Sequence, residues 1–99
     1  MDQPLTADHF KPHIGKGFKV KDGRHELTLA KVDLRRLEAH EITLFERPPF
    51  TLVFSGPPRD VLPQGMYTLD VADGPSFEIY LMPILTPVAT RQDYQSIFN

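Results

Sequence analysis

Two histidines near the N-terminus have the spacing of a metal site. His9 and His13 are four residues apart, which would place both rings on one face of a helix, and Asp8 could supply a third ligand. However, Pro12 lies between the two histidines, and no Glu follows the first one as it does in a zinc hydrolase helix. We therefore interpret the pair as surface histidines on a short helix.

No other combination of residues has the spacing of a metal or cofactor site. The chain has no Cys, which excludes disulfides, thiolate nucleophiles and Cys-based metal centres. His25 and His40 are isolated in the sequence, and we interpret them as surface residues that flank strands. The sequence therefore predicts no bound metal and no cofactor.

Residues that could take part in catalysis are present without a catalytic motif. Ser55 precedes Gly56, but the Gly-x-Ser-x-Gly pattern of a nucleophile elbow is absent. The stretch at residues 15–17, Gly-Lys-Gly, lacks the spacing and the Lys-Ser/Thr ending of a phosphate loop. Four acidic residues lie in the centre of the chain, but they have no fixed spacing that would pair two carboxylates for acid–base catalysis: Asp33, Glu38, Glu41 and Glu46. We therefore predict that the protein is not an enzyme.

Outward-facing apolar residues are the candidate functional group. Residues 77, 79 and 81 are apolar and predicted to face the core, so Tyr80 and Met82 face outward from the same strand. Val53 faces outward in the same way from the strand that begins at Phe50. Such residues are typical of the centre of a protein interface. They would equally suit the second covered face of a closed barrel or sandwich.

Apolar and polar residues alternate between Phe50 and Met82, and this pattern predicts the strands that would carry the outward-facing residues. Alternation occurs at residues 50–55, 67–71 and 77–82, and Gly, Pro and Asp residues separate the three stretches. Because a period of two places alternate residues on one face, the three strands share a buried side. We expect Pro83 and Pro87 to end the third strand, since proline cannot donate a ladder hydrogen bond.

The N-terminal part of the chain predicts a short helix and a hairpin. Thr6 can cap a helix that places Phe10 and Ile14 on one face. Asp22-Gly23 predicts a two-residue type I′ turn, with positive φ at both positions, between strands at residues 18–21 and 26–30. The second strand continues toward residues 32 and 34, and its apolar positions change parity between 29 and 32, which indicates a bulge.

Two further segments flank these elements. In residues 34–45, Leu34, Leu37 and Glu41 have helical spacing, whereas residues 42–45 could form a strand. We favour a strand end, an irregular connection and a return strand that finishes before Pro48-Pro49. The C-terminal segment from Tyr94 to Phe98 is predicted to be a final strand, because a free tail would expose its apolar side chains. On this strand we expect Tyr94 and Phe98 to face inward, and Ile97 to lie outside or against the helix at Phe10.

Composition predicts one globular domain over residues 1–99. The chain is 40% hydrophobic and 24% charged, which is ordinary for a folded domain. No apolar run approaches the ~20 residues of a membrane span, and the start lacks the order of a signal peptide. The net charge is −2, and basic residues are mixed with acidic ones. We therefore expect a cytoplasmic protein that binds neither membrane nor nucleic acid.

Five stretches follow one another along the chain: Phe10…Gly15-x-x-Phe18, Phe50-x-Leu52-x-Phe54-x-Gly56-Pro57, Leu62-Pro63-Gln64-Gly65-x-Tyr67-x-Leu69, Leu81-x-Pro83 and a terminal Tyr94-x-x-x-Phe98-Asn99. Taken together, these motifs resemble a bacterial family known only as a domain of unknown function. The resemblance covers nearly the whole chain, and residues 34–47 fall outside its motifs. It implies a small stand-alone β protein, of a kind often found beside phage-tail-collar-type proteins, with no catalytic residues. Its most specific elements are Phe-x-Leu-x-Phe-x-Gly-Pro at residues 50–57 and Gln-Gly-x-Tyr at residues 64–67.

The expected fold is all-β: a small antiparallel barrel or tight sandwich of about six or seven strands with one short N-terminal helix. The expected function is that of a non-enzymatic structural or accessory protein in a phage-tail-like or secreted assembly. It would act through protein–protein contacts or self-association, with Val53, Tyr80 and Met82 as the interface. The alternative is a small-ligand-binding barrel whose mouth is lined by the Pro-rich loops. An exposed apolar patch would favour the first function, and an enclosed pocket with convergent polar groups would favour the second.

Overall fold

Six antiparallel strands form a closed barrel in the computed structural model, which describes residues 5–34, 39, 49–72, 74–84 and 89–98. Around the barrel, the strands follow the order β1-β2-β3-β6-β5-β4. This confirms the predicted all-β fold and decides between its two forms in favour of the barrel. The strands are β1 (Gly17–Val20), β2 (Glu26–Leu34), β3 (Phe50–Gly56), β4 (Gly65–Val71), β5 (Ser76–Ile84) and β6 (Gln92–Phe98).

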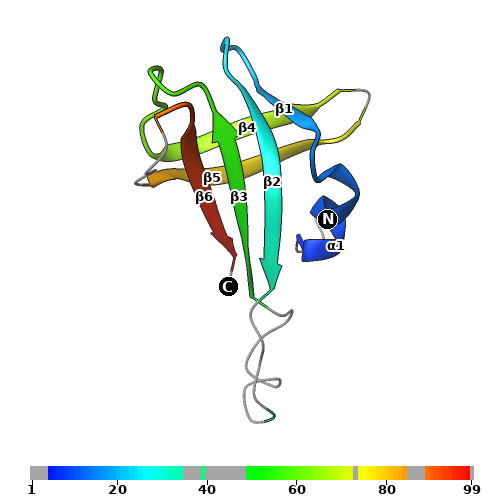
Figure 1. Cartoon of the computed structure of the whole chain (residues 1–99). Helices are drawn as coiled ribbons and strands as arrows, with labels where there is room; N and C mark the ends of the chain where they lie inside the picture. The colour runs from blue at the N-terminus through cyan, green and yellow to red at the C-terminus, as the bar shows by residue number, and fades with distance from the viewer. Residues whose placement is uncertain (1–4, 35–38, 40–48, 73, 85–88, 99) are drawn as a thin grey trace.

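The barrel is built as two crossed layers. In Figure 1, β2, β3 and β6 run side by side, while β1, β4 and β5 cross behind them. β5 joins the layers, because its first part pairs with β4 as far as Leu81 and its last part, Met82 to Ile84, pairs with β6. The prediction that Pro83 ends this strand is wrong. At that position β5 no longer pairs with β4, and proline is tolerated where a strand has a neighbour on one side.

The hairpin between β1 and β2 is confirmed, but its turn is longer than predicted. Five residues, 21–25, connect the strands, and Val20 N–H donates to the His25 carbonyl at 2.9 Å. Positive φ occurs at Asp22 (φ 62°) and not at Gly23. The predicted two-residue type I′ turn is therefore wrong. An Asp side chain tolerates the left-handed region through local hydrogen bonding, which allows the turn to use it there.

A bulge in β2 is confirmed at the place where the apolar parity changes. The register against β3 shifts between Leu29 and Lys31. As a result Leu29 faces the core, Ala30 and Lys31 are both exposed, and Val32 returns to the inner side, where it packs against the core. The bulge thus places two consecutive residues on the outer surface of the barrel.

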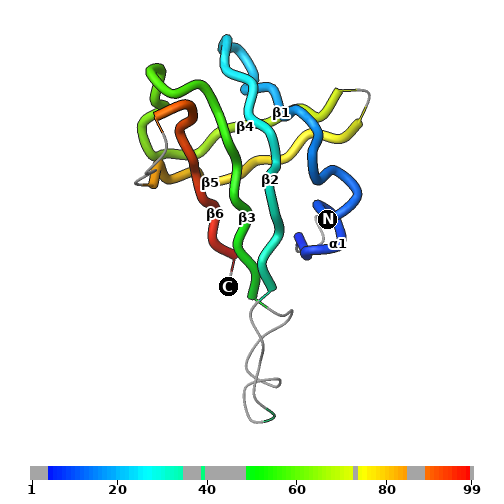
Figure 2. Tube along the Cα trace, in the orientation of Figure 1, coloured from blue at the N-terminus to red at the C-terminus, as the bar shows by residue number. Residues whose placement is uncertain are grey.

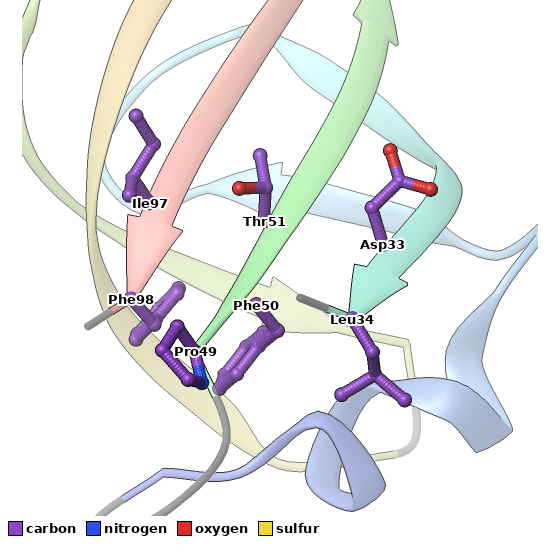
Figure 3. A pocket seen from close by; sticks show the side chains of 7 residues that line it. All are labelled: Asp33, Leu34, Pro49, Phe50, Thr51, Ile97 and Phe98. Atoms are coloured by element: carbon purple, nitrogen blue, oxygen red, sulfur yellow. The ribbon is translucent and has the colours of Figure 1, made fainter. Parts of the chain in front are cut away.

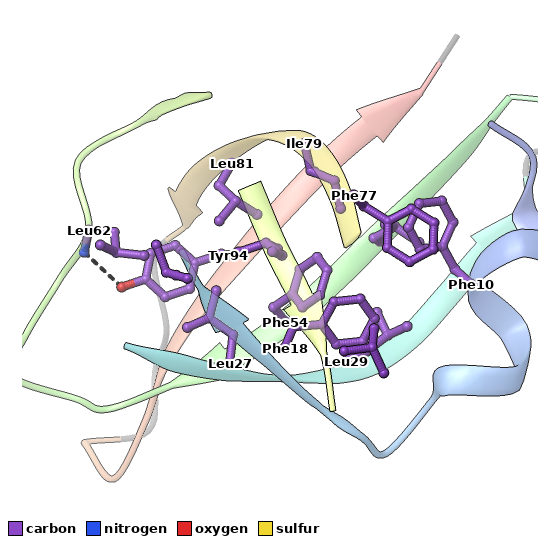
Figure 4. Packing of buried hydrophobic residues seen from close by; sticks show 14 of the residues in the cluster. Phe10, Phe18, Leu27, Leu29, Phe54, Leu62, Phe77, Ile79, Leu81 and Tyr94 are labelled. Carbon is purple, nitrogen blue, oxygen red and sulfur yellow. Dashed lines mark hydrogen bonds between the residues drawn. The ribbon is translucent and has the colours of Figure 1, made fainter. Parts of the chain in front are cut away.

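The barrel interior is filled by one cluster of apolar side chains (Figure 4). The predicted inward residues of β3, β4 and β5 are buried, except that Tyr67 is partly buried. The largest fully buried side chains are Tyr94, Phe10, Phe18, Phe50, Phe54, Leu27, Leu29, Leu52, Leu69, Ile79 and Leu81.

A short helical segment covers one end of this cluster. α1 (Ala7–Phe10) follows the predicted cap Thr6 and continues into the 3₁₀-helix η1 (Lys11–His13); Figure 2 shows both beside the lower part of β2. The Phe10 ring lies 4.5 Å from that of Phe77 and 5.7 Å from that of Phe98, measured between centroids. Ile14, expected on the same face as Phe10, is 46% exposed because the helix ends before it.

The C-terminal strand is also confirmed. β6 pairs with β3 over its whole length, from Gln92 opposite Gly56 to Phe98 opposite Phe50. Tyr94 is fully buried, Phe98 packs on the core and is partly exposed, and Ile97 is exposed, as expected from the alternation. The predicted return strand before Pro48-Pro49 lies outside the described residues.

Candidate functional site

The strand register brings two of the three predicted interface residues into one row on the outer surface. Val53 of β3 lies opposite Gln95 of β6, and Gln95 lies opposite Met82 of β5. The same row continues to Lys31 of β2, which lies opposite Val53. Val53 and Met82 are partly buried and therefore form the floor of this surface. We call these four residues the outer row.

Tyr80, the third predicted residue, lies next to the outer row. It is two residues from Met82 on the same face of β5, and it pairs with Met66 of β4. Ile97 lies two residues from Gln95 in the corresponding direction along β6. These three neighbours project into solvent, with exposed fractions of 44% for Tyr80, 61% for Met66 and 50% for Ile97.

Sequence reasoning missed Met66, Gln95 and Ile97 as members of this surface. Met66 has the outward parity of its strand, so the alternation at residues 67–71 could have identified it. Gln95 and Ile97 could not have been assigned, because their place beside Val53 depends on the pairing of β6 between β3 and β5.

A hollow of about 460 Å³ adjoins the outer row at Val53. Its apolar wall consists of Ala30, Val53 and Ile84. Asp93 accepts hydrogen bonds from the Ser55 hydroxyl at 3.2 Å and from Arg91 Nε at 2.9 Å. Among the described residues, the hollow is lined by Ala30, Lys31, Val53, Ser55, Ile84, Arg91 and Asp93.

A second hollow, of about 300 Å³, lies where β2 and β6 end and β3 begins (Figure 3). Two stacked rings form one side of it, with the Phe50 and Phe98 centroids 4.6 Å apart and their planes 5° from parallel. Ile97 and Leu34, each 50% exposed, and Thr51 also line it, together with Asp33 and Pro49. Among the described residues that line it, the polar side chains are those of Thr51 and Asp33.

A polar cluster joins two loops beyond the strands. Asp60, between β3 and β4, accepts hydrogen bonds from Arg24 through one carboxylate oxygen, with Nε at 2.9 Å and Nη2 at 2.6 Å. His25 Nε2 donates to the Asp60 carbonyl oxygen at 2.8 Å and lies 3.3 Å from the other carboxylate oxygen. The hydrogen bond from Arg24 lowers the pKa of the Asp60 carboxyl, and the charges of Arg24 and His25 add to this against the opposing effect of burial.

Tyr94 of β6 also contacts the connection between β3 and β4 that carries Asp60. The buried Leu62 N–H donates to the Tyr94 hydroxyl at 2.9 Å (Figure 4). Burial raises the pKa of the Tyr94 phenol, and the nearby Asp60 charge acts in the same direction. His25, interpreted from the sequence as a surface residue, is in fact mostly buried, because the loop carrying Asp60 covers it. Tyr94 thus connects the β3–β4 loop to β6.

The N-terminal histidines occupy separate environments. The Thr6 N–H donates to His9 Nδ1 at 2.9 Å, while the His13 ring packs edge-on against Phe18 and Phe77. Within residues 5–34, 39, 49–72, 74–84 and 89–98, no group of three or more His, Cys, Asp or Glu side chains could hold a metal ion. Over the same ranges, no helix has the length and the apolar character needed to cross a membrane.

Comparison with known proteins identifies the family of the chain. No curated protein and no solved structure shows significant similarity to it. The model of one family matches residues 5–98, which is nearly the whole chain and includes every strand of the barrel. The protein therefore belongs to DUF6916, a family described as a domain of unknown function.

Proposed function

We propose that the protein is a non-enzymatic structural or accessory component that acts through protein–protein contacts on its outer row and on the adjoining Tyr80. The observation that carries the proposal is the register Val53–Gln95–Met82, which gathers residues from three strands on one surface. Exposed Tyr80, Met66 and Ile97 extend this surface. Large exposed apolar side chains that lie together are typical of interaction sites.

The setting that we propose is a bacterial phage-tail-like or secreted assembly, which follows from the sequence resemblance. The protein would be made in the cytoplasm and would join such an assembly by this surface. The enzymatic alternative has less support, because the polar clusters around Asp60 and Asp93 are internally hydrogen-bonded and include no activated nucleophile.

A small-ligand-binding barrel is the second candidate. A ligand barrel needs an interior space, but here the side chains of Phe18, Phe54 and Tyr94 are fully buried among the other core residues. The two hollows described above lie toward the surface rather than along the barrel axis, where the buried side chains pack. The packed interior therefore favours the interface over the ligand barrel.

Photo-crosslinking tests the proposal at a single position. A benzophenone amino acid replaces Tyr80, and a matched control protein carries it at Lys19, an exposed residue of β1 outside the outer row. Both proteins are expressed in the organism that carries the gene and are irradiated. We expect a discrete crosslinked product from position 80, either a second copy or another protein, and none from position 19.

Size-exclusion chromatography with light scattering of the purified protein then tells self-association from a heterologous partner. Excess wild-type protein should reduce the crosslink at position 80 by competing for the same partner. Equal products at both positions, or none at position 80, would contradict the proposal.

A further inference from the structure

The hollow beside Val53 combines an apolar wall with cationic side chains. The bulge in β2 places Ala30 and Lys31 side by side on the outer surface, and Val53 and Ile84 continue the wall. Arg91, which precedes β6, also lines the hollow, together with Ser55 and Asp93. A volume of about 460 Å³ is enough for one side chain of a partner together with its neighbour.

Arg91 is held in place while part of its guanidinium remains available. Its Nε donates to Asp93, whose side chain is only 14% exposed and also accepts from Ser55. A guanidinium has five N–H donors, and this contact uses one of them. In the described part of the chain, no hydrogen bond from the two terminal NH₂ groups of Arg91 is found. An oriented pair of NH₂ groups is suited to bind a carboxylate.

Arg91 is one of few basic residues in the C-terminal half of the chain. Residues 50–99 contain two Lys or Arg, Arg59 and Arg91, against five Asp or Glu. On the other side of the hollow, Lys31 forms an ion pair with Asp33 at 3.3 Å, and both side chains are more than half exposed. An exposed ion pair of this kind contributes little to stability, so Lys31 can exchange its partner for an incoming anion.

We infer that this hollow binds an acidic side chain, Asp or Glu, that a partner protein presents next to an aliphatic residue. The carboxylate is bound by the terminal NH₂ groups of Arg91 and by the Lys31 ammonium, and the aliphatic neighbour covers Val53 and the rest of the apolar wall. The inference rests on the proposed function, because Val53 belongs both to the outer row and to the hollow. It adds the chemistry of the partner to that proposal.

Titration of the ¹⁵N-labelled protein with two blocked tripeptides tests the inference by NMR. The probes are acetyl-Leu-Glu-Leu-amide and its matched control acetyl-Leu-Gln-Leu-amide. We expect the Glu peptide to shift the backbone amides of Val53, Ser55 and Asp93, and to bind at least about tenfold more tightly than the Gln peptide. Raising the salt concentration from about 50 to 300 mM should weaken the binding, because the charges are partly exposed. Equal binding of the two peptides, or shifts elsewhere on the barrel, would overturn the inference.

Two variants on opposite sides of the hollow separate recognition from folding. We expect Arg91→Gln to weaken binding of the Glu peptide by about tenfold, with Arg91→Lys between this variant and the wild type. We expect Lys31→Gln to weaken binding of the Glu peptide about twofold. Because the Lys31 side chain is exposed and lies far from the core, this variant should fold and can still test the inference if Arg91→Gln does not fold. Binding of the Glu peptide that neither neutral variant reduces would rule the assignment out.

A third probe separates a protein partner from a free acid. If 4-methylpentanoate binds as tightly as the Glu peptide, the hollow is a site for small acids and the assignment to a partner protein is wrong. Failure of the proposed function is a distinct result, since it appears as a missing crosslink at position 80 whatever the peptides do. If position 80 gives a crosslink but the Glu peptide binds no more tightly than the Gln peptide, the proposed interface is supported and the inference of an acidic partner residue is wrong.

Discussion

Tyr94 shows how a single polar atom in the core connects a strand to a loop. Its ring is fully buried, and its hydroxyl accepts the Leu62 N–H at the point where the β3–β4 connection crosses the barrel end. A buried backbone donor without a partner costs about 1–3 kcal/mol. The hydroxyl therefore contributes to stability through the loop, in addition to the packing of the ring.

Tyr94→Phe is expected to lower the free energy of unfolding by about 1–3 kcal/mol, because the Leu62 N–H loses its acceptor without gaining access to water. Urea denaturation followed by circular dichroism measures the change. Tyr80→Phe is the matched control, since that side chain is 44% exposed, and it should stay within about 0.5 kcal/mol of the wild type. Equal effects of the two substitutions would show that the hydrogen bond to Leu62 contributes nothing.

Gly56→Ala should also be destabilising, by about 1–3 kcal/mol, because a Cβ at this position would lie 2.6 Å from Leu27 Cδ2 and 3.3 Å from Tyr94 Cε1. Gly65→Ala provides the comparison, since the nearest atom to its Cβ would be Tyr67 Cε2 at 3.9 Å. Thermal melting of both variants measures the difference. A Gly56→Ala protein that melts together with Gly65→Ala would contradict the close packing of β3 against β2 and β6.

At the scale of elements, β6 is the strand on which closure of the barrel depends. It lies between β3 and β5, and it contributes Tyr94 and the half-buried Phe98 to the core. The Phe98 ring stacks on Phe50 and contacts Phe10, so the last strand also fixes the helix that covers this end. The C-terminal segment is thus an integral part of the fold.

Deletion of residues 94–99 is expected to unfold or aggregate the protein. Truncation of one buried aromatic costs about 3–5 kcal/mol, and the whole stability of a domain is about 5–15 kcal/mol. Far-UV circular dichroism and light scattering detect the loss. Ile97→Ala serves as the mild control, because Ile97 faces outward. A truncated protein that stays soluble and melts like the full-length chain would show that the tail is an arm for a partner.

For the whole molecule, the polar cluster at Asp60 couples stability to pH. The folded-state pKa of Asp60 is lowered, chiefly by the hydrogen bond from Arg24. Because the folded-state pKa is lower than the unfolded-state pKa of about 3.9, the ionised carboxylate stabilises the folded protein above the unfolded-state pKa. This stabilisation is lost as the pH falls through the folded-state pKa. The β3–β4 connection should therefore loosen from the β1–β2 turn under acidic conditions.

Asp60→Asn tests this coupling. The wild type should lose stability as the pH falls from about 5 to 3, and the variant should lose less over the same range because it has no carboxylate at this position to protonate. Urea denaturation at each pH measures the two slopes. Asp33→Asn is the control, as Asp33 forms only an exposed ion pair with Lys31. Parallel slopes for wild type and Asp60→Asn would refute the coupling.

Local patterns of amino acids were enough to predict several elements of the fold. Alternation with period two marked β3, β4 and β5 and their buried faces, because a pleated strand repeats every two residues. The change of parity after Leu29 marked the bulge, and the apolar tail marked β6. Val53, Tyr80 and Met82 were identified as outward residues by the same parity argument.

Which strands are neighbours, and therefore which residues make up the site, depends on how the barrel closes. β3 is followed along the chain by β4, yet it pairs with β6, so Gln95 lies between Val53 and Met82. Likewise, the contact between His25 and Asp60 joins residues 35 positions apart. Parity is a property of each strand alone, whereas pairing depends on which strands close the barrel around a shared core. For this reason the sequence predicted outward residues but not the surface that they form together.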